Sequence, residues 1–579
     1  MLFARITGVT AVSLSLSICL AQAQTPPTSE RLEAIQKRMA NVKNEAISKL
    51  SPRLQKALSG GALNFLQFAT AGQRIQESLG EAPTNESKLA KMKTALQSKR
   101  QSRLIASSGL IPVSDSSGDF SFSIMGGFTQ SETSTAWCGS NVVVGFNDSG
   151  SAFESLVSGP GGVSFSGAGA STDAGNTFRD IGYINPGSNP NNFLEGDAVV
   201  NCVDANTFYY SQIAASGTLD APTSAVVLSK STDGGFTWGE PVTAVSKDAV
   251  THFLDKDWSA VDPKNPQNIY ISYTDFDDSF TTCPDAERAA IEIVHSTDGG
   301  TTWSAPTLVD EACGSPPDFP FSQGSQIVVD SHSRVYLGWE RFSDPASSTR
   351  ELRIAKSTNH ATSFAASSKV VSVFPTGDGF ALQGNFRSWL TGSLAVDRSG
   401  TKTDGDLYVT WEDGRLHSTP DLESPFGLYR SANVLISRST DGGTTWCPPV
   451  RVDSGPLESS AGFGVDHFQP GAAVDSTGAV GVCWYDRRDD AVNYQVSRYC
   501  GVSMDYGAAW KDARVDPRIW PAIHATDALI NPWYLGDYDT VASDQTQSLT
   551  GFQGAYGNVT LQAPVPNQDV FLVHLNNWR

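Results

Sequence analysis

The chain has 579 residues and a formal net charge of −20, from 41 basic and 61 acidic side chains. Phosphate binding needs clustered Lys and Arg, so this acidity disfavours nucleic acid as a main partner. Because 39% of the residues are hydrophobic and 18% are charged, the chain is expected to fold, as several domains or as one large repeat-built body.

The first 23 residues have the pattern of a secretory signal peptide. An apolar run from Val9 to Leu20 follows one early basic residue, and Ala21-Gln22-Ala23 is a small-x-small cleavage site. The run is too short to cross a membrane and no later segment qualifies, so no transmembrane segment is predicted. We expect cleavage after about Ala23 and a secreted or periplasmic protein.

Residues 24–117 form a second region with a helical pattern. Apolar side chains such as Leu32, Ile35, Met39 and Val42 recur at three- and four-residue steps. Residues 24–103 contain 14 Lys/Arg and 6 Asp/Glu, so a basic segment precedes an acidic body. The plainer interpretation is a solvated helical spacer, and the alternative is an arm or pro-segment that folds against the body.

Helical patterns stop after Gly118, and residues 118–579 are predicted to be all-β. Runs such as NVVVGF, NIYISYTD, RVYLGWER and AVGVCWYD are rich in β-branched and aromatic residues. Gly, Asp, Asn and Pro separate them, as expected for short strands joined by turns.

An eight-residue pattern recurs along this region. It reads STDGGFTW at residues 231–238 and STDGGTTW at residues 296–303 and 439–446, with weaker copies that begin at Ser171, Ser357 and Ser503. The third positions are Asp173, Asp233, Asp298, Asn359, Asp441 and Asp505, mostly a little over sixty residues apart. A repeat of this length made of short strands predicts a β-propeller of four-stranded antiparallel sheets.

The chemistry of the pattern predicts a locked turn. The Asp carboxylate can accept hydrogen bonds from N–H groups of its own turn, the Gly two residues later can take positive φ, and the final aromatic ring can pack between sheets. We therefore interpret the acidic third positions as structural: Asp173, Asp233, Asp298, Asp441 and Asp505.

The pattern S-x-D-x-G-x-T-W resembles the Asp-box, or BNR repeat, of sialidase-like β-propellers. The resemblance covers about residues 125–579. It implies a propeller whose boxes lie on the turn between the third and fourth strands, away from the ligand. It does not select one function, because the family includes sialidases, other glycoside hydrolases, polysaccharide lyases and non-catalytic binding proteins.

Seven blades are expected, with six, as in known sialidases, as the alternative. Six units end in a box or its remnant. A seventh begins near residues 534–544 and ends with DVFLVHL close to the C-terminus. Its missing outer strand is predicted to come from FSFSIMG, residues 120–126, so that the two ends of the chain close the ring.

Ligands should approach the face opposite the boxes, where the inner strands begin and the second strands end. The W-x-D/R-x-R patterns there place Arg341, Arg415 and Arg487 at nearly equivalent positions, and three converging guanidinium groups could hold an anion. Asp197 and Asp537, which follow a Gly before their inner strands, are predicted to bind substrate as well. The alternative is that each Arg pairs with an Asp of its own blade and braces the loops.

Resemblance to sialidases implies an Arg triad, a Tyr–Glu nucleophile pair and an Asp acid/base. By position, Glu340 or Glu412 would polarise Tyr538, and Asp257 would handle the proton. The chain departs from sialidases because it contains no RIP sequence. A secreted sialidase-like glycoside hydrolase acting on an acidic or decorated glycan is the leading hypothesis. The alternatives are a non-catalytic propeller that binds glycans or proteins, and a polysaccharide lyase with a base such as His467 or Tyr538.

No cofactor is predicted, and a monomer is expected. A structural Ca²⁺ held near residues 404–406 or 277–278 is an alternative, although neither segment is a complete ligand loop. Seven cysteines follow the signal peptide. The predicted strand positions suggest the disulfides Cys138–Cys202, Cys283–Cys313 and Cys483–Cys500, which would leave Cys447 free, but the spacing alone does not decide the pairing.

Overall fold

The computed structural model describes residues 110–115, 129–217, 221–314, 320–342, 349–374, 376, 382, 388, 392–416, 431–458, 464–521, 535–562 and 565–575. The predicted signal peptide and helical region lie almost wholly outside these ranges. Among the described residues, no helix is long and apolar enough to cross a membrane.

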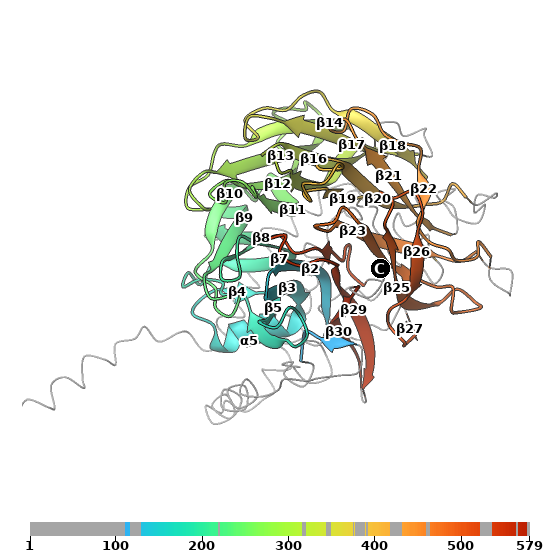
Figure 1. Cartoon of the computed structure of the whole chain (residues 1–579). Coiled ribbons are helices and arrows are strands. Elements are labelled where there is room, and N and C mark those ends of the chain that lie inside the picture. Colours follow the sequence, from blue (N-terminus) through green and yellow to red (C-terminus); the bar gives the residue numbers. More distant parts are fainter. Residues whose placement is uncertain are drawn as a thin grey trace, which may run out of the picture.

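Seven antiparallel sheets are arranged as blades around a common axis (Figure 1), which confirms the predicted seven-bladed propeller. In each blade the strands are given from the inner to the outer position. Blade 1 is β2 (Gln130–Cys138), β3 (Asn141–Asp148), β5 (Ser166–Ser171) and β6 (Arg179–Tyr183); blade 2 is β7 (Phe193–Cys202), β8 (Phe208–Gly217), β9 (Pro222–Ser231) and β10 (Val242–Asp248), with β4 (Val163–Ser164) parallel to β7; blade 3 is β11 (His252–Val261), β12 (Ile269–Asp277), β13 (Glu287–Ser296) and β14 (Thr307–Gly314).

The remaining blades follow in chain order. Blade 4 is β15 (Phe321–Val329), β16 (Val335–Phe342), β17 (Arg350–Ser357) and β18 (Ser368–Val373); blade 5 is β19 (Ser393–Val396), β20 (Leu407–Asp413), β21 (Asn433–Ser439) and β22 (Val450–Arg451); blade 6 is β23 (His467–Val474), β24 (Val480–Asp486), β25 (Gln495–Ser503) and β26 (Lys511–Arg514), with β27 (Trp520–Pro521) beside β25; blade 7 is β28 (Val541–Ala542), β29 (Gln553–Gln562), β30 (Val565–His574) and β1 (Ile111–Pro112).

Blade 7 is completed from the N-terminal side, but by a segment other than the predicted one. Ile111 pairs with Leu572 and Pro112 with Phe571, so β1 occupies the outer position. The propeller therefore begins before residue 118. Residues 120–126, which were predicted to fill this place, lie outside the described residues.

One helix, α5 (Ser149–Ser158), interrupts blade 1 where only strands were predicted. Asp148 caps it by accepting a hydrogen bond from the Gly150 backbone N–H at 2.9 Å, and the Ser151 hydroxyl donates to the same carboxylate at 2.5 Å. An Asp followed by a Ser-rich turn is a good N-cap, which explains the local helix.

The core lies between neighbouring blades. Val143 and Tyr210 pack with Trp238 between blades 1 and 2, and Tyr408 packs with Trp484 between blades 5 and 6. Burial of a side chain such as Val or Phe stabilises a fold by about 1.5–3 kcal/mol, so these inter-blade clusters stabilise the ring. The three predicted disulfides are present, and Cys138–Cys202 joins the inner strands of blades 1 and 2. Cys447 is free and exposed.

Each repeated box begins at the last residue of a third strand. In the box of blade 2, the Ser231 hydroxyl donates to Asp233 Oδ1 at 2.8 Å, and the Gly235 N–H donates to Ser231 Oγ at 2.9 Å. The Thr237 N–H and hydroxyl also donate to the Asp233 carboxylate, at 2.9 and 2.7 Å. These bonds satisfy the turn locally, so the carboxylate is committed to its own loop.

A second set of Asp residues, which the sequence analysis did not separate from other turn residues, ends the inner strands at the same face. The set consists of Asp262, Asp330, Asp397, Asp475 and Asp544. Several also bond to the next blade: Ser333 Oγ donates to Asp262 Oδ1 at 3.0 Å, and the Gly551 N–H donates to Asp475 Oδ2 at 3.0 Å. This face is therefore held by two concentric sets of turn carboxylates.

Candidate functional site

The inner strands carry a β-bulge near the opposite face in five blades. The pairing shifts register at Ser131/Ser134, Gly196/Val199, Asp255/Trp258, Gln323/Gln326 and Phe468/Gly471. One residue of each bulge has a left-handed backbone, and Asp537 follows Gly536 (φ 119°) at the corresponding place in blade 7. We call this set the axial ring: Glu132, Asp197, Lys256, Gly324, Gln469 and Asp537. Strained backbone of this kind concentrates at functional sites.

The axial ring joins blades that are far apart in the sequence. Lys256 Nζ lies 2.5 Å from Asp537 Oδ2, and the Asp537 N–H donates to Glu132 Oε1 at 3.0 Å. Asn147 then bridges two ring members, because its Nδ2 donates to Glu132 Oε2 at 2.6 Å and its Oδ1 accepts from the Asp197 N–H at 2.8 Å. These contacts are buried, with Lys256 4% exposed and Asp537 0%.

Burial sets the protonation of the ring. It raises the pKa of Glu132 well above its ordinary value, with the Asp197 charge adding to the shift. It raises the pKa of Asp197 to about 7, against the attraction of Lys256. Burial alone would lower the pKa of Lys256, but the Asp537, Glu132 and Asp197 carboxylates outweigh it and raise the pKa. The ring thus combines carboxyl groups whose pKa values are raised, Glu132 and Asp197, with one buried ion pair.

Asp257, the predicted acid/base, follows Lys256 directly and is 2% exposed. Neither of its carboxylate oxygens accepts a hydrogen bond of normal geometry. The nearby Ser211 hydroxyl, which lowers the pKa of Asp257, donates to Ser259 at 2.8 Å. Burial is the larger effect and raises the pKa of Asp257 well above its ordinary value, with Asp255 adding to the shift. Burial therefore favours the protonated form of the Asp257 carboxyl group.

Tyr538, the predicted nucleophile, is turned toward blade 2. Its hydroxyl donates to the Ala198 carbonyl at 3.0 Å, and its ring packs edge-to-face with Trp258 at 5.5 Å between centroids. Burial raises the pKa of Tyr538 well above its ordinary value, and the Glu132 charge adds to this shift. The phenol is therefore neutral and is bonded to backbone.

The two predicted glutamates are each bonded inside the fold. Glu340 Oε1 lies 2.5 Å from Arg350 Nη1 in the same blade. Glu412 accepts hydrogen bonds from the hydroxyls of Thr376 (2.9 Å) and Ser388 (2.6 Å) and from the Gln469 N–H (2.9 Å). Burial raises the pKa of Glu412 to about 7, although these bonds oppose the shift. Glu412 of blade 5 thus supports the bulge of blade 6 through the Gln469 N–H, as Asn147 of blade 1 supports the bulge of blade 2 through the Asp197 N–H.

Each of the three predicted arginines has an acidic partner. Arg341 pairs with Asp310, Arg415 Nη2 lies 2.7 Å from Asp413 Oδ2, and Arg487 Nη1 lies 2.9 Å from Asp466 Oδ2. The Arg341 and Arg415 side chains are about a quarter exposed, whereas that of Arg487 is fully buried. The pairs of Arg415 and Arg487 lie within one blade, as the alternative to an anion clamp predicted, whereas Asp310 belongs to blade 3 and pairs with Arg341 of blade 4.

The repeated W-x-D-x-R pattern forms a clasp at the end of the second strand. Trp411 Nε1 donates to Asp413 Oδ2 at 2.8 Å, and Trp484 Nε1 donates to Asp486 Oδ2 at 2.8 Å. Arg415 binds the first carboxylate, and Arg488 binds the second at 2.7 Å. The structural equivalent of Arg415 is therefore Arg488, four residues after its Trp, and not the predicted Arg487.

A charged cluster in blade 3 escaped the sequence analysis. Tyr273 donates to Glu292 at 2.9 Å, and Glu292 also binds Lys247 (2.6 Å) and Arg288 (3.1 Å). No clear sequence signal marks this cluster, because Tyr273 and Glu292 are 19 residues apart and meet only through the pairing of β12 with β13. With two cations on Glu292, this cluster is a compensated ion network.

One group of described residues, His252, Asp275 and Asp277, has metal-ligand chemistry. However, His252 presents Nδ1 to Asp275 at 3.0 Å and Nε2 to Asp277 at 4.0 Å, so different ring nitrogens face the two carboxylates. Lys247 Nζ also lies 2.8 Å from Asp275. This geometry suits a salt-bridge network, because the Lys247 ammonium already binds the Asp275 carboxylate.

No protein-family model and no curated protein matches the chain. Among solved structures, it is similar to a PL25 ulvan lyase, with 8% identity over 77% of this chain and 95% of that one and a TM-score of 0.45. It is similar to the GH93 α-L-arabinofuranosidase of Fusarium graminearum bound to arabinobiose, with 13% identity over 65% and 92% of the chains and a TM-score of 0.41. It is also similar to the NanB sialidase of Streptococcus pneumoniae, with 11% identity over 76% of this chain and 83% of that one and a TM-score of 0.38. These similarities concern the fold, and no residue role is transferred from them.

Proposed function

We propose that this protein is a secreted carbohydrate-active enzyme of the glycoside-hydrolase type, acting on an acidic or decorated glycan at the axial ring. The observation that carries this proposal is a buried carboxyl group, Asp257, whose pKa is raised by burial and which lies next to the Lys256–Asp537 ion pair. Hydrolysis of a glycosidic bond needs one protonated and one ionised carboxyl group, and environments that separate the two pKa values supply them. Three disulfides agree with an extracellular location.

Roles follow from the protonation states. Asp257 would donate its proton to the leaving glycosidic oxygen, since burial favours its protonated form. Asp537, held ionised by Lys256 at 2.5 Å, would activate the attacking water or attack the sugar. Asp197, with a pKa of about 7, would contribute to substrate binding.

The tyrosine mechanism of sialidases has less support. Tyr538 donates its hydroxyl proton to a backbone carbonyl, and its raised pKa makes the phenolate costly. Arg341, Arg415 and Arg487 are retained as proposed ligand contacts, but each would have to exchange Asp310, Asp413 or Asp466 for a substrate anion. A lyase has less support, since the His467 side chain is fully buried between Asp486 at 2.8 Å and Asp453 at 3.4 Å.

A second candidate is a propeller that binds the glycan without cleaving it. The burial of Asp257 and Asp537, at 2% and 0% exposed, favours this candidate, because catalytic groups must reach the substrate. The two candidates predict different results: only an enzyme releases cleavage products, and only its activity falls when Asp257 is replaced by Asn.

The test is a screen of the purified secreted protein against sialylated, uronate-containing and sulfated oligosaccharides, scored for new reducing ends and for unsaturated products. Asp257→Asn should lower kcat by about 10²–10⁴-fold, the usual contribution of a general acid. Asp277→Asn, a buried carboxyl of the blade 3 network, is the matched control and should keep full activity. Glu412→Ala and Arg415→Ala test the positions predicted from sequence.

Each result has a distinct meaning. Glycan binding without any product would support the binding candidate and reject hydrolysis. Full activity of Asp257→Asn would reject the assigned acid. Unsaturated products would identify a lyase, and the absence of both binding and turnover across the screen would reject both candidates.

A further inference from the structure

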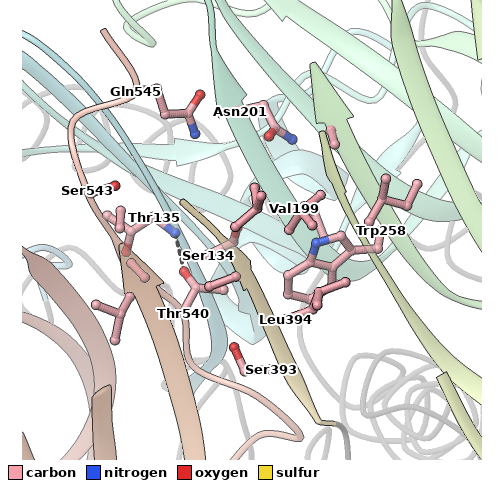
Figure 2. A pocket seen from close by; sticks show the side chains of 18 of the residues that line it. Ser134, Thr135, Val199, Asn201, Trp258, Ser393, Leu394, Thr540, Ser543 and Gln545 are labelled. Atoms are coloured by element: carbon pink, nitrogen blue, oxygen red, sulfur yellow. Dashed lines mark hydrogen bonds between the residues drawn. The ribbon is translucent and has the colours of Figure 1, made fainter. Parts of the chain in front are cut away.

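The axis of the propeller contains a cavity of about 140 Å³ that no predicted site residue lines. Inner strands of all seven blades contribute to its wall, including Val199, Trp258, Leu394 and Thr540 (Figure 2). The volume is close to the 150 Å³ of engineered cavities that accept benzene, so the space suits a molecule of about six heavy atoms. An oligosaccharide would not fit.

The cavity is closed toward the axial ring. A void of about 10 Å³, large enough for one water, separates the two and is lined by Gln469, Asp537 and Tyr538. Trp258, Ser393 and Thr540 line both spaces. Inner and third strands of a blade run in the same direction, so the other end of the cavity lies at the face of the box turns. Arg398 and Gln545, which follow the ends of β19 and β28, belong to this end.

The lining of the cavity, as far as the structure describes it, contains one charged side chain, Arg398. Arg398 is half-buried and makes no hydrogen bond or ion pair with another described residue. The acidic group that acts on it is Asp330. That carboxylate is already bound by the Arg334 guanidinium and backbone N–H and by the Tyr336 hydroxyl.

An unpaired guanidinium in a partly desolvated cavity is costly, and an anion would offset that cost. Polar side chains also line the cavity: Ser543, Asn201 and Gln545 (Figure 2). Asn201 Nδ2 already donates to Ser259 and Gln545 Oε1 accepts from the Cys202 N–H, so Asn201 Oδ1, Gln545 Nε2 and the Ser543 hydroxyl are the groups that can bind a hydroxylated ligand. The rest of the lining includes apolar surface from Val199, Leu394 and the Trp258 indole. A planar carboxylate suits the fork of Arg, and a short hydroxylated carbon chain suits the remainder.

We propose that this cavity is a binding site for a small hydroxycarboxylate of three or four carbons, entered from the box-turn face, with Arg398 as the group that binds its carboxylate. The site is separate from the axial ring and does not depend on the function proposed there.

Trp258 reports on occupancy because it lines the cavity. The difference in fluorescence between the wild type and Trp258→Phe isolates its signal. Sodium lactate, titrated at constant ionic strength, should change that signal with saturation, and propane-1,2-diol, which lacks the carboxylate, should not. Hydrogen bonds to charged groups contribute about 1.5–3 kcal/mol, so Arg398→Gln should weaken lactate at least tenfold.

Lys402→Gln is the matched control. Lys402 lies four residues after Arg398 and is exposed, so this variant removes one positive charge outside the cavity. It should bind lactate as the wild type does. If Lys402→Gln weakened lactate binding as much as Arg398→Gln does, the effect would be one of general electrostatics and the site would be rejected. If Arg398→Gln bound lactate with unchanged affinity, Arg398 would not be the carboxylate-binding group and the proposal would be overturned.

Crystals of the wild type soaked in sodium bromide give an answer that needs no variant. An anomalous peak at the Arg398 guanidinium inside the cavity is expected. Bromide found elsewhere but not there, together with no lactate response of Trp258, would exclude the proposal.

Discussion

The backbone N–H of Gly139 donates to Asp544 Oδ1 at 3.0 Å, which joins two residues 405 positions apart. Gly139 follows the first inner strand and Asp544 follows the last, so this bond crosses the seam where the ring closes. Near the other end of the same seam, the Thr133 hydroxyl donates to Asp539 at 2.8 Å. The ring is thus closed by its inner strands as well as by β1.

Asp544→Ala should destabilise the propeller more than an ordinary turn substitution. The carboxylate is buried and also accepts from Thr546, Ser548 and Leu549, so its loss removes several hydrogen bonds at once. We expect the free energy of unfolding to fall by about 3 kcal/mol, measured by urea denaturation. Asp204→Ala is the control, because exposed Asp204 caps only its own turn through Asn206 and Thr207. Equal losses in the two variants would contradict a closing role for Asp544.

The box turns should make stability depend on pH in the acidic range. Hydrogen bonds from Thr302 and Ser296 hold the pKa of Asp298 at about 2, below its ordinary value. A lowered folded-state pKa stabilises the fold above the unfolded-state pKa, near 4, and that contribution is lost as the pH falls toward 2. Asp298→Asn should reduce this acid sensitivity in denaturant titrations at pH 2–5.

The chain provides its own control for this substitution. Asn359 occupies the third position in blade 4, accepts from the Ser357 hydroxyl at 2.8 Å and donates to Ser363 at 2.8 Å. An amide therefore fits the turn, and Asn359→Asp should increase the acid sensitivity. If Asp298→Asn left the pH profile unchanged, the carboxylate bonds would have no thermodynamic role.

Lys256→Met should destabilise the protein strongly at neutral pH. It leaves Asp537 and the neighbouring Glu132 and Asp197 without their buried cation, and removal of one partner of a buried ion pair costs about 3–5 kcal/mol. The raised pKa values of Glu132 and Asp197 mean that folding binds protons at these groups, so the deficit should shrink as the pH falls below about 7 and grow as it rises.

The matched control for Lys256 is Lys247→Met. Lys247 binds Asp275 and Glu292, but Arg288 binds both carboxylates as well. Its loss should therefore be smaller, when both variants are measured by chemical denaturation at pH 5 and pH 7.5. Similar losses, or a Lys256→Met deficit that does not vary with pH, would show that the ring is not the coupled cluster described here.

Local chemistry made the blades predictable from the sequence, whereas the strand pairing that closes the ring was not predictable. The STDGG turns satisfy themselves within eight residues, so sequence alone located them and gave seven blades. The outer strand of blade 7 has only two residues, Ile111 and Pro112, and shows no alternating pattern, so the longer FSFSIMG run was the more attractive choice. The helix after Asp148 has only ten residues, and its apolar residues Ala152, Phe153 and Leu156 cover little more than one turn, which is too short a pattern to predict a helix among strands.

The site was predicted in part, because its members depend on strand register. Asp197, Asp257, Asp537 and Tyr538 were named from their places before inner strands, and all four lie at or beside the axial ring. Lys256 was not among the predicted site residues, since nothing in the sequence places it against Asp537, 281 residues away. The bulge turns one residue per inner strand toward the axis, and a bulge has no sequence signature here.

Arg415→Ala should reveal whether this side chain braces the fold or binds a ligand. Arg415 and Trp411 both donate to Asp413, and Arg488 and Trp484 both donate to Asp486. As a brace, Arg415 should contribute about 1–2 kcal/mol to stability, and a double-mutant cycle with Asp413→Asn should show coupling between the two. Arg488→Ala should give a similar loss, because Arg488 is its structural equivalent. A ligand clamp predicts the opposite pair of results, weaker glycan binding at unchanged Tm, so parallel thermal unfolding and binding measurements on the two variants distinguish the roles.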